Sequence, residues 1–135
     1  MSKGKNVMRE ILFRGKTQQH SRWIYGDLNH YMCDDGVFIA ENGHSMHRVF
    51  KESTGQFTGL RDKNNTKIFE GDIVTCQTKY GADVGQIIFA MGKFCVWWHS
   101  EYHYPNCAKM IMCYDINSKT KVIGNIIDNP ELLNN

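Results

Sequence analysis

The residues best suited to bind a metal ion lie in the segment WWHSEYHYPNC, residues 97–107. His99, His103 and Cys107 recur at intervals of four residues, which would bring them to one face of a helix. Imidazole and thiolate groups are both zinc ligands. However, Pro105 and the many aromatic residues argue against a helix, and no fourth ligand is evident. We therefore expect no metal ion in this segment and no other cofactor.

The same segment offers aromatic faces and imidazole groups to a partner. Its candidate binding residues are Trp97, His99, Tyr102, His103 and Tyr104. Aromatic faces stack on the bases of a nucleic acid or a nucleotide, and aromatic side chains are also enriched in protein interfaces. We favour a protein partner for these residues, with a nucleic acid or a small nucleotide as the alternatives.

A strand over residues 94–98 would carry the first of these side chains. Successive side chains of a strand point to opposite faces of the sheet. Val96 and Trp98 would then face the core, and Trp97 would lie on the outer face, where a partner can reach it.

Glu70 and Asp72 form the second candidate pair, because two carboxyl groups can act as general acid and base. No nucleophile accompanies them, and Gly71 between them interrupts a strand pattern, which marks a bulge or a sharp corner. We predict a corner whose acidic side chains accept backbone hydrogen bonds. The chain also has no phosphate-binding loop, nucleophile elbow or metalloprotease motif, so we expect no catalytic residues and no enzyme.

Short strands and turns are the elements that position these residues. We predict strands at residues 9–14, 22–33, 37–39, 47–50, 67–69, 73–76, 85–89, 94–98 and 121–127. The first would end at Gly15, and the second would be broken at Gly26. Asn129 would cap a single helical turn that starts at Pro130. No window has a long helical period, so the predicted fold is all-β.

Two turns have clear signals. Asp62 favours the first position of a turn over residues 62–65, and Asn65 tolerates the left-handed conformation needed near its end. Residues 90–93, AMGK, would connect two strands as a hairpin.

The composition is typical of a globular domain. The chain has 135 residues, of which 12% are aromatic and 22% charged, with a net charge of +2 and a pI of about 8.3. Dedicated nucleic-acid-binding domains have a pI above about 9. The first 22 residues nevertheless hold six basic residues and one acidic residue, so a basic amino-terminal arm could contact phosphates.

The five cysteines make an odd number and contain no C-x-x-C pair, which favours a reducing compartment over a disulfide framework. Cys76 and Cys95 lie within predicted strands and would be small buried residues. The first residues, MSKGKNV, lack the apolar region of a signal peptide. No apolar run approaches the roughly 20 residues of a membrane span, so we expect no membrane partner.

Four segments together resemble the YopX family of phage and prophage proteins. They are MREILFRGK at residues 8–16, WIYGDL at 23–28, residues 55–74, and VIGNIIDNPELL at 122–133. Their order and spacing match over almost the whole chain. The family pattern usually has a glycine after the Asp-Lys-Asn of the central turn, where this chain has Asn65. Asparagine is the next-best residue for a left-handed conformation, so the same fold is expected.

The resemblance implies a phage or prophage origin and a carboxy-terminal SH3-like β-barrel. We accordingly divide the chain into a flexible extension over residues 1–7, an amino-terminal β-lobe over 8–54, and the barrel with a short terminal helical turn over 55–135. The matching motifs consist of corner and turn residues, so no catalytic residues carry over.

We therefore expect a phage-encoded, non-enzymatic binding protein of the host cytoplasm, an adaptor or inhibitor of a host protein. Exposed strand edges and outward aromatic side chains need covering in a small all-β protein, so we also expect a homo-oligomer. Two alternatives stay open. One is nucleic-acid binding through the basic arm, and the other is sequestration of a nucleotide signal in pockets between subunits.

Overall fold

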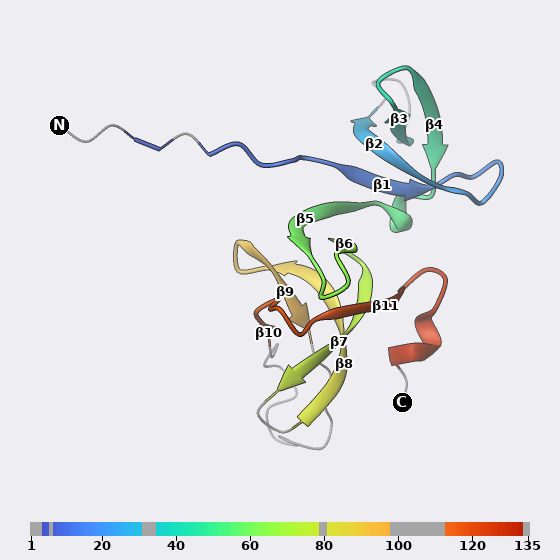
Figure 1. Ribbon diagram of the computed structural model, residues 1–135. Helices are drawn as coiled ribbons and strands as arrows, with labels where there is room; N and C mark the ends of the chain where they lie inside the picture. The colour runs from blue at the N-terminus through green and yellow to red at the C-terminus, as the bar shows by residue number, and fades with distance from the viewer. Residues whose placement is uncertain (1–3, 6, 31–34, 79–80, 98–112, 134–135) are drawn as a thin grey trace.

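The computed structural model of the chain is all-β, as the sequence predicts (Figure 1). It describes residues 4–5, 7–30, 35–78, 81–97 and 113–133. Within these ranges the strands form two antiparallel sheets, accompanied by two short 3₁₀ turns.

The first sheet has the strand order β4-β3-β2-β1-β5-β6. Its strands are β1 (Phe13–Lys16), β2 (Trp23–His30), β3 (Val37–Glu41), β4 (Ser45–Val49), β5 (Gly55–Arg61) and β6 (Lys67–Phe69). The 3₁₀ turn η1 (Lys51–Ser53) lies between β4 and β5. The core of this sheet consists of the aliphatic side chains Ile24, Val37, Ile39 and Val49.

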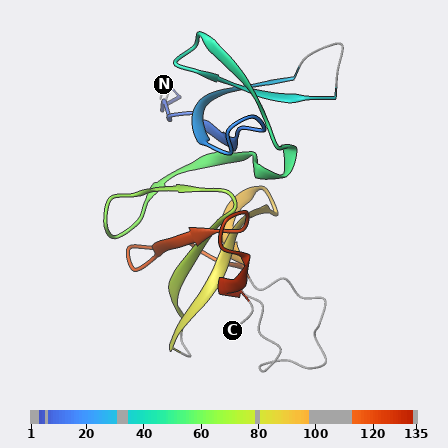
Figure 2. The ribbon, with the colours of Figure 1, turned by 90° about the vertical axis from the view of Figure 1, so that its right-hand side faces the viewer.

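The second sheet has the strand order β10-β9-β8-β7-β11. Its strands are β7 (Asp72–Thr78), β8 (Gly81–Ala90), β9 (Lys93–Trp97), β10 (Cys113–Tyr114) and β11 (Lys121–Asn125), and the 3₁₀ turn η2 (Pro130–Leu133) follows. Its core consists of Val74, Cys76, Ile87 and Val96, together with Ile68 from β6. The last strand of the first sheet thus packs into the core of the second. Figure 2 shows β5 and β6 between the β1–β4 end of the molecule and the β7–β11 end. The second sheet, which has five antiparallel strands, is compatible with the predicted SH3-like barrel.

The first two strands differ from the prediction. β1 begins later than expected and continues through Gly15, where a Cβ atom would lie 2.8 Å from a methyl carbon of Val49. β2 also continues through Gly26, where a Cβ atom would overlap the Ala40 carbonyl oxygen. Both glycines therefore allow a neighbouring strand to approach closely, and neither ends a strand.

The predicted turns are confirmed. The Asp62 Oδ1 atom accepts hydrogen bonds from the backbone N–H of Asn64 at 2.8 Å and of Thr66 at 2.9 Å. Asn65 has a φ of 65°, in the left-handed region. The β8–β9 hairpin turns at Met91 and Gly92, with φ values of 51° and 78°.

The turn predicted at Pro130 is confirmed as η2, and the Asn129 carbonyl oxygen accepts a hydrogen bond from the Leu132 N–H at 3.1 Å at its start. The Asn129 side chain accepts a hydrogen bond from the Asn125 backbone N–H at 3.2 Å. The interaction ties η2 back to the end of β11.

Cys76 and Cys95 are buried free thiols, as predicted. No helix among the described residues is long and apolar enough to cross a membrane. The division of the chain at residue 55 stays a prediction. The strand that begins there, β5, is hydrogen-bonded to β1 in the first sheet.

Candidate functional site

A cleft of about 220 Å³ lies where the two sheets meet. The first sheet and its connections contribute Arg14, Trp23, Glu52 and Glu70, and β8 contributes Gln86 and Phe89. Residues far apart in sequence therefore converge on one concave surface, which is the usual form of a binding site.

Arg14, which lines this cleft, belongs to a buried ion pair. The Arg14 Nη2 atom of β1 lies 2.8 Å from the Asp72 Oδ1 atom of β7, and the two side chains are 9% and 3% exposed. The Asp72 Oδ2 atom also accepts a hydrogen bond from the Phe69 backbone N–H at 2.7 Å. Burial raises the pKa of Asp72, although the Arg14 guanidinium and the Phe69 N–H oppose the rise. The pair joins the two sheets, and the Asp72 carboxylate balances the charge of Arg14.

Two aromatic rings hold the Arg14 guanidinium in place. Its central carbon lies 4.8 Å from the centroid of the Trp23 ring and 4.9 Å from that of Phe69. These distances are within the range of cation–π attraction. The Arg14 Nε atom is buried and has no hydrogen-bond partner among the described residues. Stacking and the ion pair thus fix the side chain as a structural element of the cleft.

The predicted corner at Gly71 forms the next part of the wall. Gly71 has a φ of 93°, its N–H donates to the Ile87 carbonyl oxygen, and its own carbonyl accepts from the Ile126 N–H, both at 2.9 Å. The neighbouring Glu70 Oε1 atom accepts from the Gln56 N–H at 3.4 Å. The prediction that acidic corner residues accept backbone hydrogen bonds is therefore confirmed for both Glu70 and Asp72.

Asp128 fixes the orientation of Trp23. The Trp23 Nε1–H donates to the Asp128 Oδ2 atom at 2.7 Å, and the Lys16 ammonium donates to Oδ1 at 2.6 Å. The hydrogen bonds from Lys16 and Trp23 lower the pKa of Asp128, so the carboxyl group is ionised over most of the pH range. The Trp23 side chain, which lines the cleft, is therefore oriented by a hydrogen bond.

The groups that remain available to a ligand are acidic or neutral. Glu52 is exposed, and no hydrogen bond or ion pair of its side chain occurs within the described residues. The Gln86 amide is half-buried and likewise unpaired in that part of the chain, and Glu70 uses one carboxylate oxygen. Because Arg14 and Asp72 neutralise each other, Glu52 and Glu70 give the cleft a negative charge. This charge favours a cationic group and disfavours a phosphate.

Apolar side chains extend the cleft onto the β8–β9 hairpin. Phe89 is 55% exposed although it lines the cleft, and Met91 at the hairpin tip is 80% exposed. The Phe89 ring packs edge to face against Phe94 at a centroid distance of 5.0 Å. Exposed apolar groups beside a partly polar cleft are typical of protein-binding surfaces.

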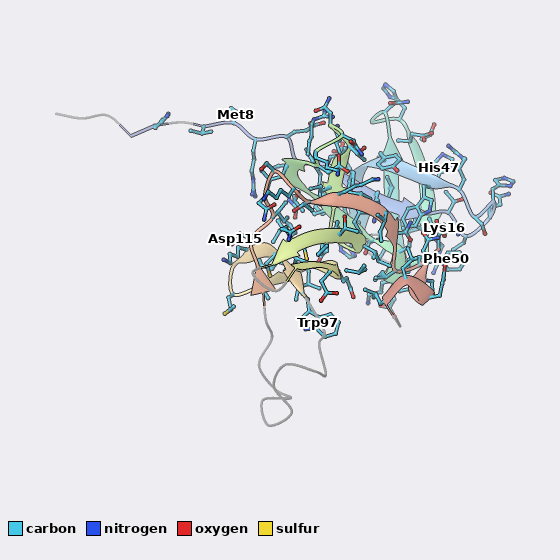
Figure 3. The ribbon with its side chains drawn as sticks, turned by 60° about the horizontal axis from the view of Figure 1, so that its bottom comes forward. Met8, Lys16, His47, Phe50, Trp97 and Asp115 are labelled. Atoms are coloured by element: carbon cyan, nitrogen blue, oxygen red, sulfur yellow. The ribbon has the colours of Figure 1, made fainter. Side chains whose placement is uncertain are left out.

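Trp97 is the one predicted binding residue that the structure describes. It ends the described part of β9, at the edge of the molecule (Figure 3), and it is the register partner of Gln86 in the cleft wall. His99, Tyr102, His103 and Tyr104 lie outside the described residues, as do Trp98 and Cys107.

The prediction that Val96 faces the core is confirmed. Trp97 and Cys95 lie on the same face of β9. This face is not fully exposed to solvent, however, because Cys95 is fully buried and Trp97 is half-buried.

Sequence reasoning missed the importance of Arg14, Trp23, Glu52 and Gln86. Arg14 counted among the basic residues of the amino-terminal arm, yet it is buried. An arginine inside the apolar run ILFRG was the available signal, because a buried charge requires a partner. Glu52 and Gln86 gave no such signal. Among the described residues, no group of three or more His, Cys, Asp or Glu side chains could hold a metal ion.

Comparison with solved structures gives a match to the crystal structure of protein EF1440 from Enterococcus faecalis. The sequence identity is 22% and the TM-score 0.52, and the match covers 93% of this chain and 99% of the other. At this identity the match shows a common fold. No curated protein matches the sequence. The family model described as YopX protein matches residues 12–134, which is nearly the whole chain. This chain belongs to the YopX family.

Proposed function

We propose that this chain is a non-enzymatic binding protein that holds a partner protein at the cleft and at the Phe89–Met91 hairpin. The observation that carries the proposal is the combination of two carboxylates with exposed apolar side chains around one concave surface. A partner would insert a lysine or arginine side chain between Glu52 and Glu70 and place an apolar residue on Phe89. Acidic clefts select basic partners by long-range attraction as well as by contact.

The size of the cleft also favours a side chain as its occupant. Pockets for drug-sized ligands and cofactors have volumes of about 300–1,000 Å³. A volume of about 220 Å³ is below that range, and it suits one anchoring side chain of a protein partner. The negative charge further disfavours a nucleotide, whose phosphates would approach Glu52 and Glu70.

The family's expected phage origin gives the proposal its biological setting. In that setting the partner is a host protein in the host cytoplasm, and the chain acts as an adaptor or inhibitor by occupying a surface of that protein. The predicted SH3-like barrel would serve as the rigid support for the hairpin.

A second candidate function is nucleic-acid binding by the amino-terminal arm, where Lys5 and Arg9 are exposed. Such binding would weaken steeply with salt, in proportion to the number of phosphates contacted. Arg14, Lys16 and Arg22 are paired with Asp72, Asp128 and Glu41, which leaves fewer basic groups for phosphate than the sequence suggests.

The proposal is tested by site-specific photo-cross-linking in prophage-bearing host cells. A photoreactive amino acid at position 91 should give a covalent adduct with one host protein. Glu52→Arg should remove that adduct, whereas Asp35→Arg, the same charge change at an exposed site in the bend before β3, should leave it unchanged. An adduct that is insensitive to Glu52→Arg, or no protein adduct at all, would refute the proposal. Co-purifying nucleic acid or nucleotide without a protein adduct would instead favour the alternatives.

A further inference from the structure

The described part of the amino-terminal arm, residues 4–5 and 7–12, extends away from the body of the molecule (Figure 1). Three of its large apolar side chains are exposed: Val7 by 70%, Met8 by 86% and Ile11 by 59%. No described backbone group of residues 7–11 takes part in a sheet ladder. An extended segment with unpaired backbone and exposed apolar side chains is suited to bind another chain.

The base of the arm is held firmly, which fixes the direction in which it leaves. The Phe57 N–H donates to the Leu12 carbonyl oxygen at 2.8 Å, and the Lys67 ammonium lies 2.9 Å from the Glu10 Oε1 atom. The arm leaves at the beginning of β1 and extends away from both sheets, as Figure 1 shows. The arm of one molecule therefore extends away from the two sheets that line its own cleft.

The arm and the cleft are complementary in charge and in polarity. Arg9 is exposed and has no ion pair within the described residues, and Lys5 is exposed as well. The cleft offers the carboxylates of Glu52 and Glu70, and exposed Phe89 borders it. A basic residue between apolar neighbours, as Arg9 is between Met8 and Ile11, matches a cleft that combines these two properties.

We infer that the arm of one copy occupies the cleft of a second copy of this chain. Arg9 enters between Glu52 and Glu70 of the second copy, and Met8 and Ile11 cover its β8–β9 hairpin. The inference rests on the proposed function, because it assigns a second copy as one occupant of the same site. It also explains the exposed apolar side chains of the arm, which phosphate binding would leave uncovered.

The mass of the purified full-length chain in solution tests the inference. Size-exclusion chromatography with light scattering should give a dimer or a larger oligomer for the unaltered protein. Arg9→Glu and Glu52→Arg should each raise the dissociation constant by more than about tenfold, because each places like charges together. The matched changes Lys119→Glu and Asp35→Arg, at exposed sites elsewhere, should leave it unchanged. Unaltered thermal melting of all four variants will show that the effects are on association and not on folding.

Charge exchange and cross-linking identify the two contacting surfaces. The double variant Arg9→Glu/Glu52→Arg should associate again, because the two charges are exchanged. A photoreactive amino acid at position 8 should cross-link to residues 52–54 or 86–91 of a second copy. A monomer at all concentrations, an oligomer unaffected by Arg9→Glu, or a cross-link within one copy would each overturn the inference. These experiments use purified protein alone, so their failure leaves the cross-linking result with the host protein standing on its own.

Discussion

Arg14 and Asp72 form a buried ion pair, with 2.8 Å between Nη2 and Oδ1, that joins β1 of the first sheet to β7 of the second. The guanidinium is stacked between Trp23 and Phe69, and the carboxylate accepts the Phe69 N–H. The pair thus contributes to the shape of the cleft, which Arg14 lines, and to the stability of the fold. Removing one partner would leave the other charge buried and uncompensated.

Arg14→Leu should lower the free energy of unfolding by about 3–5 kcal/mol, the usual cost of breaking a buried ion pair. Urea denaturation followed by tryptophan fluorescence measures the change. Arg22→Leu is the matched control, because the Arg22–Glu41 pair is on the surface and its arginine side chain is 53% exposed. That control should cost no more than about 1 kcal/mol. Equal costs for the two variants would show that the buried pair has no special structural role.

Asp62 should make the stability of the protein depend on acid. Burial opposes its ionisation, but hydrogen bonds from the N–H groups of Val122, Thr66 and Asn64 outweigh burial and lower its pKa below the ordinary 3.8. Below pH 3.8 the unfolded chain therefore binds more protons at this site than the folded chain does. The stability that this carboxylate contributes is present above that pH and is lost as the pH falls through the lower, folded-state pKa.

Asp62→Asn should therefore be less stable than the unaltered protein at neutral pH and should lose less stability on acidification. Urea unfolding at a series of pH values below about 5 measures both quantities. Asp27→Asn, at an exposed site in β2, is the control and should follow the unaltered protein. If Asp62→Asn keeps the full acid dependence, other carboxylates are responsible for it.

Gly71→Val should destabilise the fold by about 1–3 kcal/mol or more, because a β-branched residue resists the φ of 93° at this corner. Space is not the cause, since the nearest atoms to an added Cβ would be 3.7 Å away. Gly71→Asn should cost less, because asparagine enters left-handed conformations more readily. Melting curves of the two variants give the comparison, and an unchanged melting temperature for Gly71→Val would contradict the role of the corner.

Trp97→Ala should weaken binding of a partner, or self-association, by about 2 kcal/mol or more, as expected for a tryptophan in an interface. Val96 is the adjacent control, since it is fully buried in the core of the second sheet. Val96→Ala should mainly lower the melting temperature. Measuring melting and oligomer mass for both variants separates the two roles, and a Trp97→Ala protein that unfolds but still associates when folded would place the binding surface elsewhere.

The local geometry of this protein follows from its amino-acid sequence alone. The turn at residues 62–65, the left-handed Asn65, the corner at Gly71 and the hairpin at Met91-Gly92 all follow from the conformational preferences of the residues in them. The all-β class follows in the same way from runs of apolar and β-branched residues between such turns. These features depend on neighbours along the chain, so the sequence is sufficient to predict them.

Which residues come into contact across the fold depends on the tertiary structure. A sequence does not show that Gly15 and Gly26 lie against neighbouring strands, so its pattern predicts a strand end or break at both glycines. Nor does it show that Arg14 is paired with Asp72, or that Glu52 and Gln86 line the same cleft. Contacts between residues far apart in the chain depend on strand order and on the packing of one sheet against the other. The local pattern of residues indicates neither the strand order nor the packing of the sheets, so the sequence does not predict the cleft.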